Sequence, residues 1–397
     1  MYLKIAHIIV CAAFFLCTQL SADEYCNQGC FLGNFWVDAE YLYWQIKNSP
    51  EPVPFVTEGP LVVYEDPLLG QPGETVILGG KAIDIGWRSG GRFALGMDFN
   101  DICYFGTLCN LGAEASYFFL PKQSKSQTVQ SSGLLGSPFL GIPFFDAVTS
   151  NESSTFLSLP GKFSGTATLK VINGMQGAEL NGLAKFSYGR SWNFSLLAGF
   201  RYWEFKEHLH FVTSSPSLTN GIPSSTFITK DKFDVNNNFY GGQLGAQVDF
   251  SYDKFFCNIK GKVALGVMYE GVHITGETIT NEYDHLGAIQ TFPGGYFALP
   301  TNIGRHDTSH FSVIPEVNIN IGYQPVEWCK LHIGYTCLYV SEMLWAGDQI
   351  DRDLNPSQSI SITGASFALV GTASPKVPFK SGSLWAQGVS AGIEFIY

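Results

Sequence analysis

Charged residues are scarce in this chain, at 14% of its 397 residues, against roughly 25% in an average soluble protein. Basic residues are fewer than acidic ones, 23 against 34, so the formal net charge is −11. A surface that binds nucleic acid needs clustered lysine and arginine, and the sequence has no basic patch of that kind. We therefore expect no nucleic-acid partner.

Long apolar segments and catalytic motifs are missing as well. After residue 22 no apolar run reaches the roughly 18 residues that a membrane-spanning helix needs. Nucleotide-binding loops, zincin helices and nucleophile elbows are absent, so we predict no enzyme activity, no cofactor and no metal ion. The chain does contain 15% aromatic residues and 43 glycines. Low charge together with many aromatics and glycines suits a transmembrane β-barrel.

The first 22 residues have the pattern of a secretory signal peptide. Lys4 supplies the positive start, residues 5–16 are apolar with one exception, and Ala22 ends a cleavage region. A short membrane anchor is the alternative, but the apolar run is too short to span a bilayer. The expected organisation is a signal peptide at 1–22, a periplasmic segment at 23–34 and an outer-membrane β-barrel at 35–397.

The cysteine count is odd after export. Of nine cysteines, Cys11 and Cys17 leave with the signal peptide and seven remain. In an oxidising compartment at least one thiol is then unpaired or bridged to another chain. Local pairs are open for Cys26 with Cys30 and for Cys103 with Cys109, and a disulfide-linked partner is open for the odd cysteine.

Ten segments alternate apolar and polar residues in the way of β-strands. The last segment is the clearest, because Phe395 and Tyr397 share an apolar face while Glu394 lies on the other face. The predicted strands cover residues 35–46, 84–99, 108–120, 163–188, 191–212, 233–252, 255–274, 311–323, 331–344 and 385–397.

Charges fall on one parity in the middle of nearly every predicted strand. A lipid-facing Arg or Lys would cost about 2–4 kcal/mol at the bilayer midplane, which explains their absence from the apolar parity. The connections between successive strands also alternate in length. Short turns such as 189–190 and 253–254 alternate with long segments rich in Pro, Gly, Ser and Thr. The sequence therefore predicts an all-β fold: a closed antiparallel up-and-down barrel of about ten strands, with twelve as the alternative. Short turns would be periplasmic and long loops extracellular.

The inward parity supplies the candidate functional residues. They are Asp38, Glu40, Arg88, Arg92, Glu114, Glu179, Arg201, Lys260, Lys262, Glu316 and Glu394. These charges could line a conducting path or neutralise one another. A barrel near eight strands is filled by its own side chains, so ten strands predict a constricted pore.

Two weaker site hypotheses concern the connections. His208 and His210 share a strand face and could bind a metal or pair with a carboxylate, although packing at an aromatic rim is favoured. Asp348, Asp351 and Asp353 could offer oxygen ligands to Ca²⁺, although solvated loop carboxylates are favoured.

Several stretches carry a family resemblance. Residues 35–44, followed by 50–57, resemble the start of the putative beta-barrel porin family seven, a planctomycete-type group of outer-membrane proteins. Further matching stretches are 69–73, 88–92, 239–245, 298–305, 347–352 and 385–389. They occur in order over almost the whole mature chain. The resemblance implies an outer-membrane β-barrel but little about activity, because fold does not fix function.

The sequence thus predicts an integral outer-membrane protein that allows narrow passage of small solutes or ions. The alternative is a non-conducting structural or adhesive envelope protein that acts through its extracellular loops. Expected partners are outer-membrane lipid and the barrel-assembly machinery, the latter because the terminal strand ending in Tyr397 resembles the signal of bacterial outer-membrane barrels.

Overall fold

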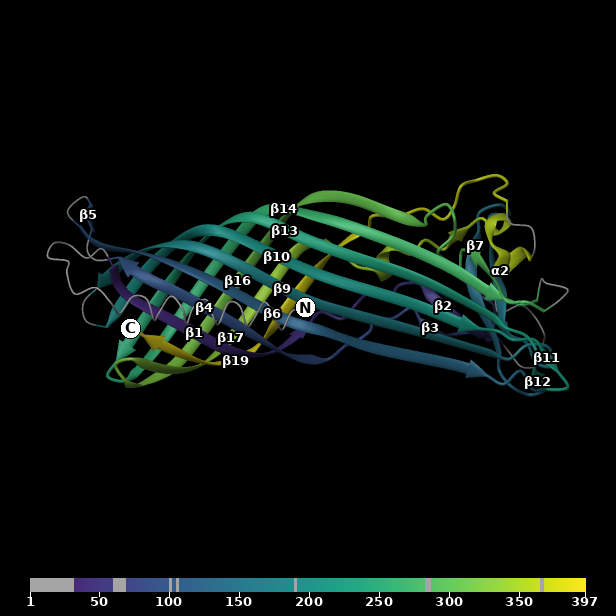
Figure 1. Ribbon diagram of the computed structural model, residues 1–397, viewed down its shortest axis with the longest axis horizontal. Coiled ribbons are helices and arrows are strands. Elements are labelled where there is room, and N and C mark those ends of the chain that lie inside the picture. Colours follow the sequence, from purple (N-terminus) through teal and green to yellow (C-terminus); the bar gives the residue numbers. More distant parts are fainter. Residues whose placement is uncertain are drawn as a thin grey trace.

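Ten long strands form a closed antiparallel barrel in the computed structural model (Figure 1). The structure describes residues 32–59, 69–99, 102–104, 107–188, 191–282, 287–364 and 368–397. The ring consists of β1 (Leu32–Ile46), β4 (Trp87–Phe99), β6 (Thr107–Ser131), β9 (Gly165–Tyr188), β10 (Trp192–Ser214), β13 (Phe227–Tyr252), β14 (Phe255–Thr280), β16 (Gly304–Val326), β17 (Cys329–Leu344) and β19 (Ser381–Ile396). Each ring strand pairs with its neighbours in sequence, and β19 pairs with β1 to close the ring. This confirms the predicted fold class and strand number.

The closing seam joins the two ends of the barrel sequence. Asp38 of β1 lies opposite Glu394 of β19. Tyr397 continues the ladder, because its N–H donates to the carbonyl of Phe35 at 2.8 Å. β1 begins at Leu32, so the barrel starts three residues before the predicted boundary. The predicted signal peptide and most of the predicted periplasmic segment lie outside the described residues.

The part of the barrel wall nearer the short turns carries a broad apolar belt on its outer surface. Leu180, Leu196, Leu244, Leu265 and Ile333 point outward, each with about half or more of its side chain exposed. Aromatic rings border the belt at both ends. At the short-turn end Trp192 contacts Phe250 and Phe255 contacts Tyr323; at the other end Tyr202, Tyr240 and Tyr269 contact one another in sequence. A soluble monomer rarely exposes so large an apolar surface, and an apolar band between aromatic girdles is the pattern of a transmembrane barrel.

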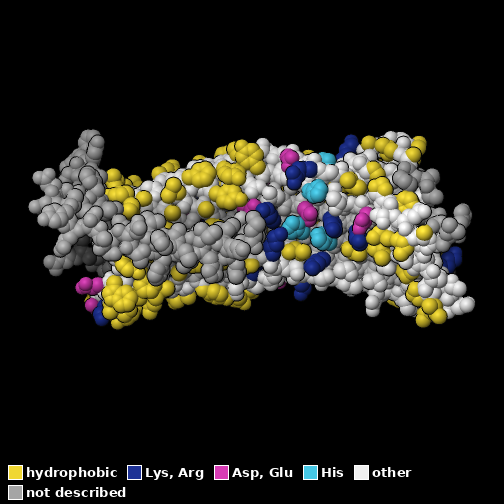
Figure 2. All heavy atoms as spheres, in the orientation of Figure 1, with side chains coloured by type: hydrophobic (Ala, Val, Ile, Leu, Met, Phe, Trp, Pro, Cys, Tyr) yellow, Lys and Arg dark blue, Asp and Glu magenta, His cyan; other side chains and the backbone are white. Residues whose placement is uncertain are grey.

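Beyond the belt the hydrophobic pattern of the long strands inverts. On β10, Phe205 and Leu209 are buried inside, whereas Lys206, His208 and His210 lie on the outer wall. Figure 2 shows basic side chains (Lys or Arg) and histidines gathered on the surface just past the apolar region. The strands therefore extend past the length that the lipid-facing pattern predicted: β6 runs to Ser131 and β14 to Thr280.

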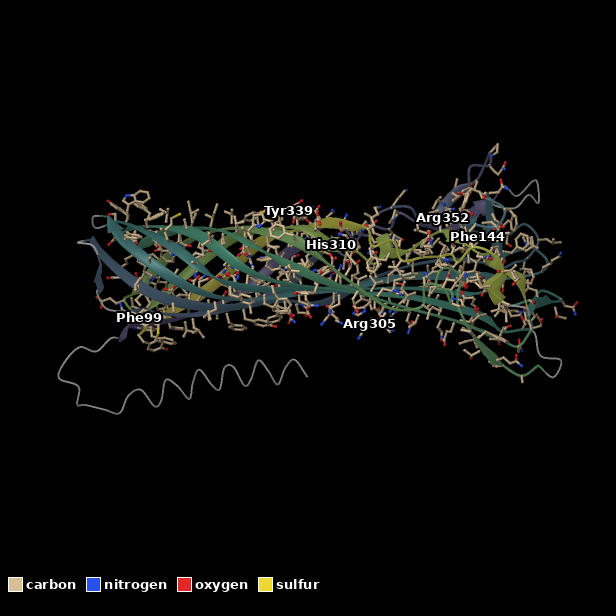
Figure 3. The ribbon with its side chains drawn as sticks, turned by 90° about the horizontal axis from the view of Figure 1, so that it is seen from above. Phe99, Phe144, Arg305, His310, Tyr339 and Arg352 are labelled. Carbon is tan, nitrogen blue, oxygen red and sulfur yellow. The ribbon has the colours of Figure 1, made fainter. Side chains whose placement is uncertain are left out.

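The long connections fold into a compact cap at the far end of the barrel (Figure 1). Five short strands from three connections form one sheet. They are β2 (Pro54–Gly59), β3 (Thr75–Gly79), β7 (Phe139–Asp146), β8 (Asn151–Ser158) and β18 (Asp353–Leu354). Phe144 is buried in the cap and Arg352 pairs there with Glu152 at 2.7 Å, at the opposite end of the molecule from Phe99 (Figure 3).

Smaller elements complete the connections. They are β5 (Ile102–Tyr104), β11 (Leu218–Thr219), β12 (Ile222–Pro223), β15 (Gln290–Pro293), η1 (Gly347–Gln349), η2 (Pro356–Gln358) and α2 (Ile360–Thr363). β5 pairs with β6 and β15 pairs with β14, but neither enters the closed ring. The alternative of twelve barrel strands is therefore not realised. No helix in the described part of the chain is both long and apolar enough to cross a membrane.

Candidate functional site

The part of the lumen nearest the short turns is a polar cavity of about 500 Å³, which we call the vestibule. It reaches the short-turn end of the barrel, where Asp253, Lys254 and Gln324 line it. Nine of the predicted lumen residues line the vestibule: Asp38, Glu40, Arg92, Glu114, Glu179, Lys260, Lys262, Glu316 and Glu394. The other two, Arg88 and Arg201, are buried beyond it. Strand parity thus places most of the predicted charges around one chamber.

The inner end of the vestibule is closed by buried ion pairs. Arg201 is fully buried and pairs with Glu179 at 2.8 Å and with Glu316. The Lys262 ammonium lies 2.8 Å from Glu179 and 3.3 Å from Glu316. Two ladder pairs therefore meet across the lumen, since Arg201 lies opposite Glu179 on adjacent strands and Lys262 lies opposite Glu316. Each carboxylate has at least two cationic partners, which offsets part of the cost of burying it.

Arg92 joins this cluster to the apolar part of the lumen. Its guanidinium lies 3.5 Å from the Glu40 carboxylate and 3.8 Å from Glu316. The same guanidinium lies over the rings of Trp44 and Phe118, at 5.5 and 6.0 Å from their centroids. Such cation–π contacts are stabilising where water is excluded. We call the three cations Arg92, Arg201 and Lys262 with the three carboxylates Glu40, Glu179 and Glu316 the charge cluster.

On the cap side of the charge cluster, the lumen is filled by buried apolar side chains, which we call the apolar plug. Its larger members are Trp44, Ile46, Phe118, Leu120, Met175, Trp203, Phe205, Phe239, Met268, Ile314, Leu338, Val340, Met343 and Trp345. The indoles of Trp44, Trp203 and Trp345 have no exposed surface. Phe205 packs edge-on against Trp345 with ring centroids 5.2 Å apart. Trp345 directly follows β17, so the last long connection contributes to the plug as well as the barrel wall.

Successive inward residues of β10 follow the lumen from one end to the other. Ser195 lines the vestibule, Arg201 belongs to the charge cluster and Trp203 belongs to the apolar plug. Glu207 follows, and Phe211 lies in the apolar core of the cap. The polar chamber is therefore confined to one end of the barrel, and packed side chains fill the lumen beyond it.

A pair of buried carboxyl groups lies between the plug and the cap. Glu207 accepts hydrogen bonds from Ser49 Oγ at 2.6 Å, Asn173 Nδ2 at 3.4 Å and the Ala346 N–H at 2.9 Å. Glu51 is equally buried, but in the described structure neither of its carboxylate oxygens has a hydrogen-bond partner. Burial, followed by repulsion from Glu207, raises the pKa of Glu51 well above its usual 4.5. Burial also raises the pKa of Glu207.

We expect Glu51→Gln to stabilise the protein at pH 8 and to have little effect at pH 4. A carboxyl group with a raised pKa in the folded state binds its proton more tightly there, so its contribution to stability is complete below the unfolded-state pKa. That contribution is lost as pH rises through the folded-state pKa. The amide is neutral at both pH values, so thermal unfolding in detergent should show a higher midpoint for the variant at pH 8. Glu327→Gln, an exposed turn residue, should shift neither midpoint. A lower midpoint for Glu51→Gln at pH 8 would contradict this assignment.

Asp231 fixes another connection over the lumen. Its buried carboxylate accepts hydrogen bonds from the backbone N–H groups of Tyr296, Phe297 and Ala298 at 2.7–3.1 Å. Burial raises its pKa to about 6, although the three N–H donors act in the opposite direction. No sequence pattern indicates a role for this residue, because its contacts join β13 to a loop distant in the chain.

Two further residues that line the vestibule, His332 and Lys330, were not predicted from the sequence. His332 of β17 lies 3.6 Å from Asp38 and 3.8 Å from Glu40. Lys330, on the same strand, pairs with Glu394 at 2.7 Å. Both have the inward parity of β17. The alternation rule would have found His332 inside the predicted strand 331–344, whereas Lys330 precedes the predicted start of that strand.

The remaining predicted residues lie elsewhere. Arg88 donates to Asn173 Oδ1 at 2.8 Å, beyond the charge cluster. His208 is on the outer wall, where its Nδ1 lies 2.7 Å from Asp234 Oδ1, so it does not face the lumen. Asp351 accepts the N–H groups of Asp353 and Lys376.

Among the residues whose side chains the structure describes, three cysteines are free thiols. Cys257 is half-buried, Cys329 is buried, and Cys337 is exposed on the outer face of β17. The local pairs predicted at Cys26 and Cys103 fall outside the residues or side chains that the structure describes. A disulfide-linked partner stays a prediction.

Comparisons with known proteins place the chain among β-barrels. A family model described as "Putative beta barrel porin-7 (BBP7)" matches residues 36–397. A search of curated protein sequences found no match. Among solved structures, the outer membrane protease OmpT from Escherichia coli is 9% identical with a TM-score of 0.35, covering 94% of this chain and all of that one. The TodX deltaS2S3 mutant monoaromatic hydrocarbon channel is 6% identical with a TM-score of 0.17, covering 94% of this chain and 91% of that one. Likenesses of this size carry nothing about activity.

Proposed function

The chain belongs to the putative beta barrel porin-7 family, and from this premise we propose that it is an outer-membrane β-barrel protein with a closed lumen. On this proposal the function of the protein lies in the cap, which the barrel holds outside the cell. The apolar plug is the observation that carries this proposal, because fully buried indoles fill the lumen between the vestibule and the cap. Of the two functions predicted from the sequence, this geometry favours the non-conducting envelope protein.

The outer wall supports the placement in a membrane. On this proposal the apolar belt is the lipid-facing part of the wall. The short turns lie in the periplasm and the cap lies outside the cell. Past the belt, His210 lies in register with Lys170 on one side and Lys232 on the other. Cationic side chains at this height attract anionic lipid headgroups. The partners on this proposal are outer-membrane lipid and, for the strand that ends at Tyr397, the barrel-assembly machinery.

The cap supports an adhesive or structural role rather than transport. Its sheet joins three separate connections, so the exposed tips are held on a folded base. Leu135, Val148 and Val370 of these connections expose more than half of their side chains. Binding residues often lie on loops that a rigid scaffold positions, and these tips have that arrangement.

Planar-bilayer recording tests the proposal. We expect the wild-type protein to insert without steps of ion current, because Phe205 of β10 contacts Trp345, which follows β17, inside the lumen. Replacing both Trp203 and Trp345 by alanine removes two fully buried side chains and should give small current steps. Large single-channel steps from the wild type would contradict a closed lumen.

Narrow ion passage is the second candidate function, favoured by the charged vestibule. If the wild type conducts, Arg92→Ala should raise conductance and cation preference, because Glu40 and Glu316 lose a cationic partner. An unchanged selectivity in that variant would place any conducting path away from the charge cluster.

A further inference from the structure

Two carboxylates and one imidazole meet on the vestibule wall beside the closing seam of the barrel. Asp38 and Glu40 are inward residues of β1, and His332 is an inward residue of β17. Their side chains are each more than nine-tenths buried. His332 Nε2 lies 3.6 Å from Asp38 Oδ2 and 3.8 Å from Glu40 Oε1, and all three potential ligand atoms lie within 4.8 Å of one another.

These separations are longer than hydrogen bonds, which have heavy-atom distances of roughly 2.7–3.2 Å. The two distances from His332 Nε2 are close to the spacing of two ligands on one ion: with metal–ligand bonds of about 2.1 Å, tetrahedral ligand atoms lie about 3.4 Å apart. His332 Nε2 and Asp38 Oδ1 are buried and have no hydrogen-bond partner in the described structure. Buried polar atoms without partners are rare and costly, so the group has unused ligating capacity.

The surrounding backbone makes room for this group. Gly392 of β19 lies directly between Glu40 and His332 in the strand ladder. A Cβ at this position would lie 2.5 Å from His332 Nε2 and 2.9 Å from Glu40 Cγ. The missing side chain therefore lets two residues from non-adjacent strands approach across β19. Arg92 holds the Oε2 atom of Glu40 and leaves Oε1 turned toward His332.

We propose that Asp38, Glu40 and His332 form a divalent-cation site of the first transition series. Two carboxylate oxygens and one imidazole nitrogen suit Mn²⁺, Fe²⁺ or Zn²⁺ better than a soft cation. All three residues line the vestibule, so the ion enters from the short-turn end. The bound ion links the first barrel strand to β17 across β19, and so stabilises the closed ring.

Mn²⁺ binding to the full-length protein tests this site. Mn²⁺ is the probe because thiolates prefer softer cations and Cys257, Cys329 and Cys337 are free. Detergent-solubilised, EDTA-treated protein is titrated while free Mn²⁺ is followed by electron paramagnetic resonance. We expect one ion per wild-type chain, and an affinity at least about tenfold weaker in His332→Asn and Asp38→Asn, the order of loss seen when even supporting residues of metal sites are removed.

Asp98→Asn is the matched control. Asp98 also lines the vestibule but pairs with Lys185, so its loss should leave Mn²⁺ affinity unchanged. Mn²⁺ should raise the thermal unfolding midpoint of the wild type and of the control, but not of His332→Asn. If His332→Asn does not fold, the isosteric Asp38→Asn decides. A wild type that binds no Mn²⁺, or three variants that bind it equally, would overturn the site, whatever the conductance measurements show.

Discussion

Arg201→Met is expected to lower the free energy of unfolding by about 3–5 kcal/mol, the usual cost of removing one partner from a buried ion pair. Arg201 has no exposed surface and contacts both Glu179 and Glu316. The charge cluster holds three cations and three carboxylates, so the loss of the Arg201 guanidinium leaves one uncompensated negative charge in the closed lumen. Methionine fills much of the same volume, so the loss reports the charge rather than a cavity.

Chemical unfolding of the refolded barrel in detergent or lipid measures this loss. Lys185→Met is the control, because Lys185 and its partner Asp98 are partly exposed in the vestibule. Such a pair contributes about 1 kcal/mol or less. Adding Glu316→Gln to Arg201→Met should restore part of the stability, since the cluster is then neutral again. Equal losses in Arg201→Met and Lys185→Met would mean that water reaches the charge cluster.

The barrel could be predicted from the sequence because lipid imposes a strict rule. A charge on the lipid-facing parity is costly, so apolar alternation marks each strand inside the membrane. That rule gives the ten strands but not their ends. Beyond the belt the outer wall carries Lys206 and His208 while Trp203 and Phe205 fill the inside. A search for apolar residues on the outer parity therefore stops too early, as it did for β6 and β14.

The candidate site could be predicted in part for the same reason. Inward parity puts charged residues in the lumen, and closure of the ring brings Glu394 beside Asp38. The partners could not be predicted, because contacts across a lumen depend on strand tilt and stagger as well as parity. Arg201 of β10, for example, reaches across the barrel to Glu316 of β16, whereas Glu394 pairs with Lys330, its direct neighbour on the adjacent strand β17.

The apolar plug illustrates the limit most clearly. Its tryptophans come from β1, from β10 and from the connection after β17. On the strands they share the inward parity of the charged residues, so local sequence does not separate a plugged lumen from an open one. The fold class follows from local alternation, whereas the state of the lumen follows from contacts between distant segments.

The second large effect is expected at the outer wall. Leu265→Arg should cost about 2–4 kcal/mol, the price of a lipid-facing cation near the bilayer midplane. Leu265 is half exposed on the outer face of β14 and lies within the apolar belt, between Phe255 and the Tyr269 girdle. The fraction of heat-modifiable folded barrel and its unfolding free energy in lipid vesicles both measure the loss.

Asn258→Arg is the control on the same strand with the opposite parity. Asn258 lines the vestibule and donates to Asp249, so an arginine there enters a polar chamber beside a carboxylate. Its cost should be much smaller than that of Leu265→Arg, while Leu265→Ala separates the loss of apolar contact from the added charge. In detergent micelles, which deform around a charge more easily than a bilayer, the gap between the two arginine variants should narrow. If both variants lose folded barrel equally in vesicles, the outward parity of β14 does not face lipid, and the membrane placement of the whole belt is wrong.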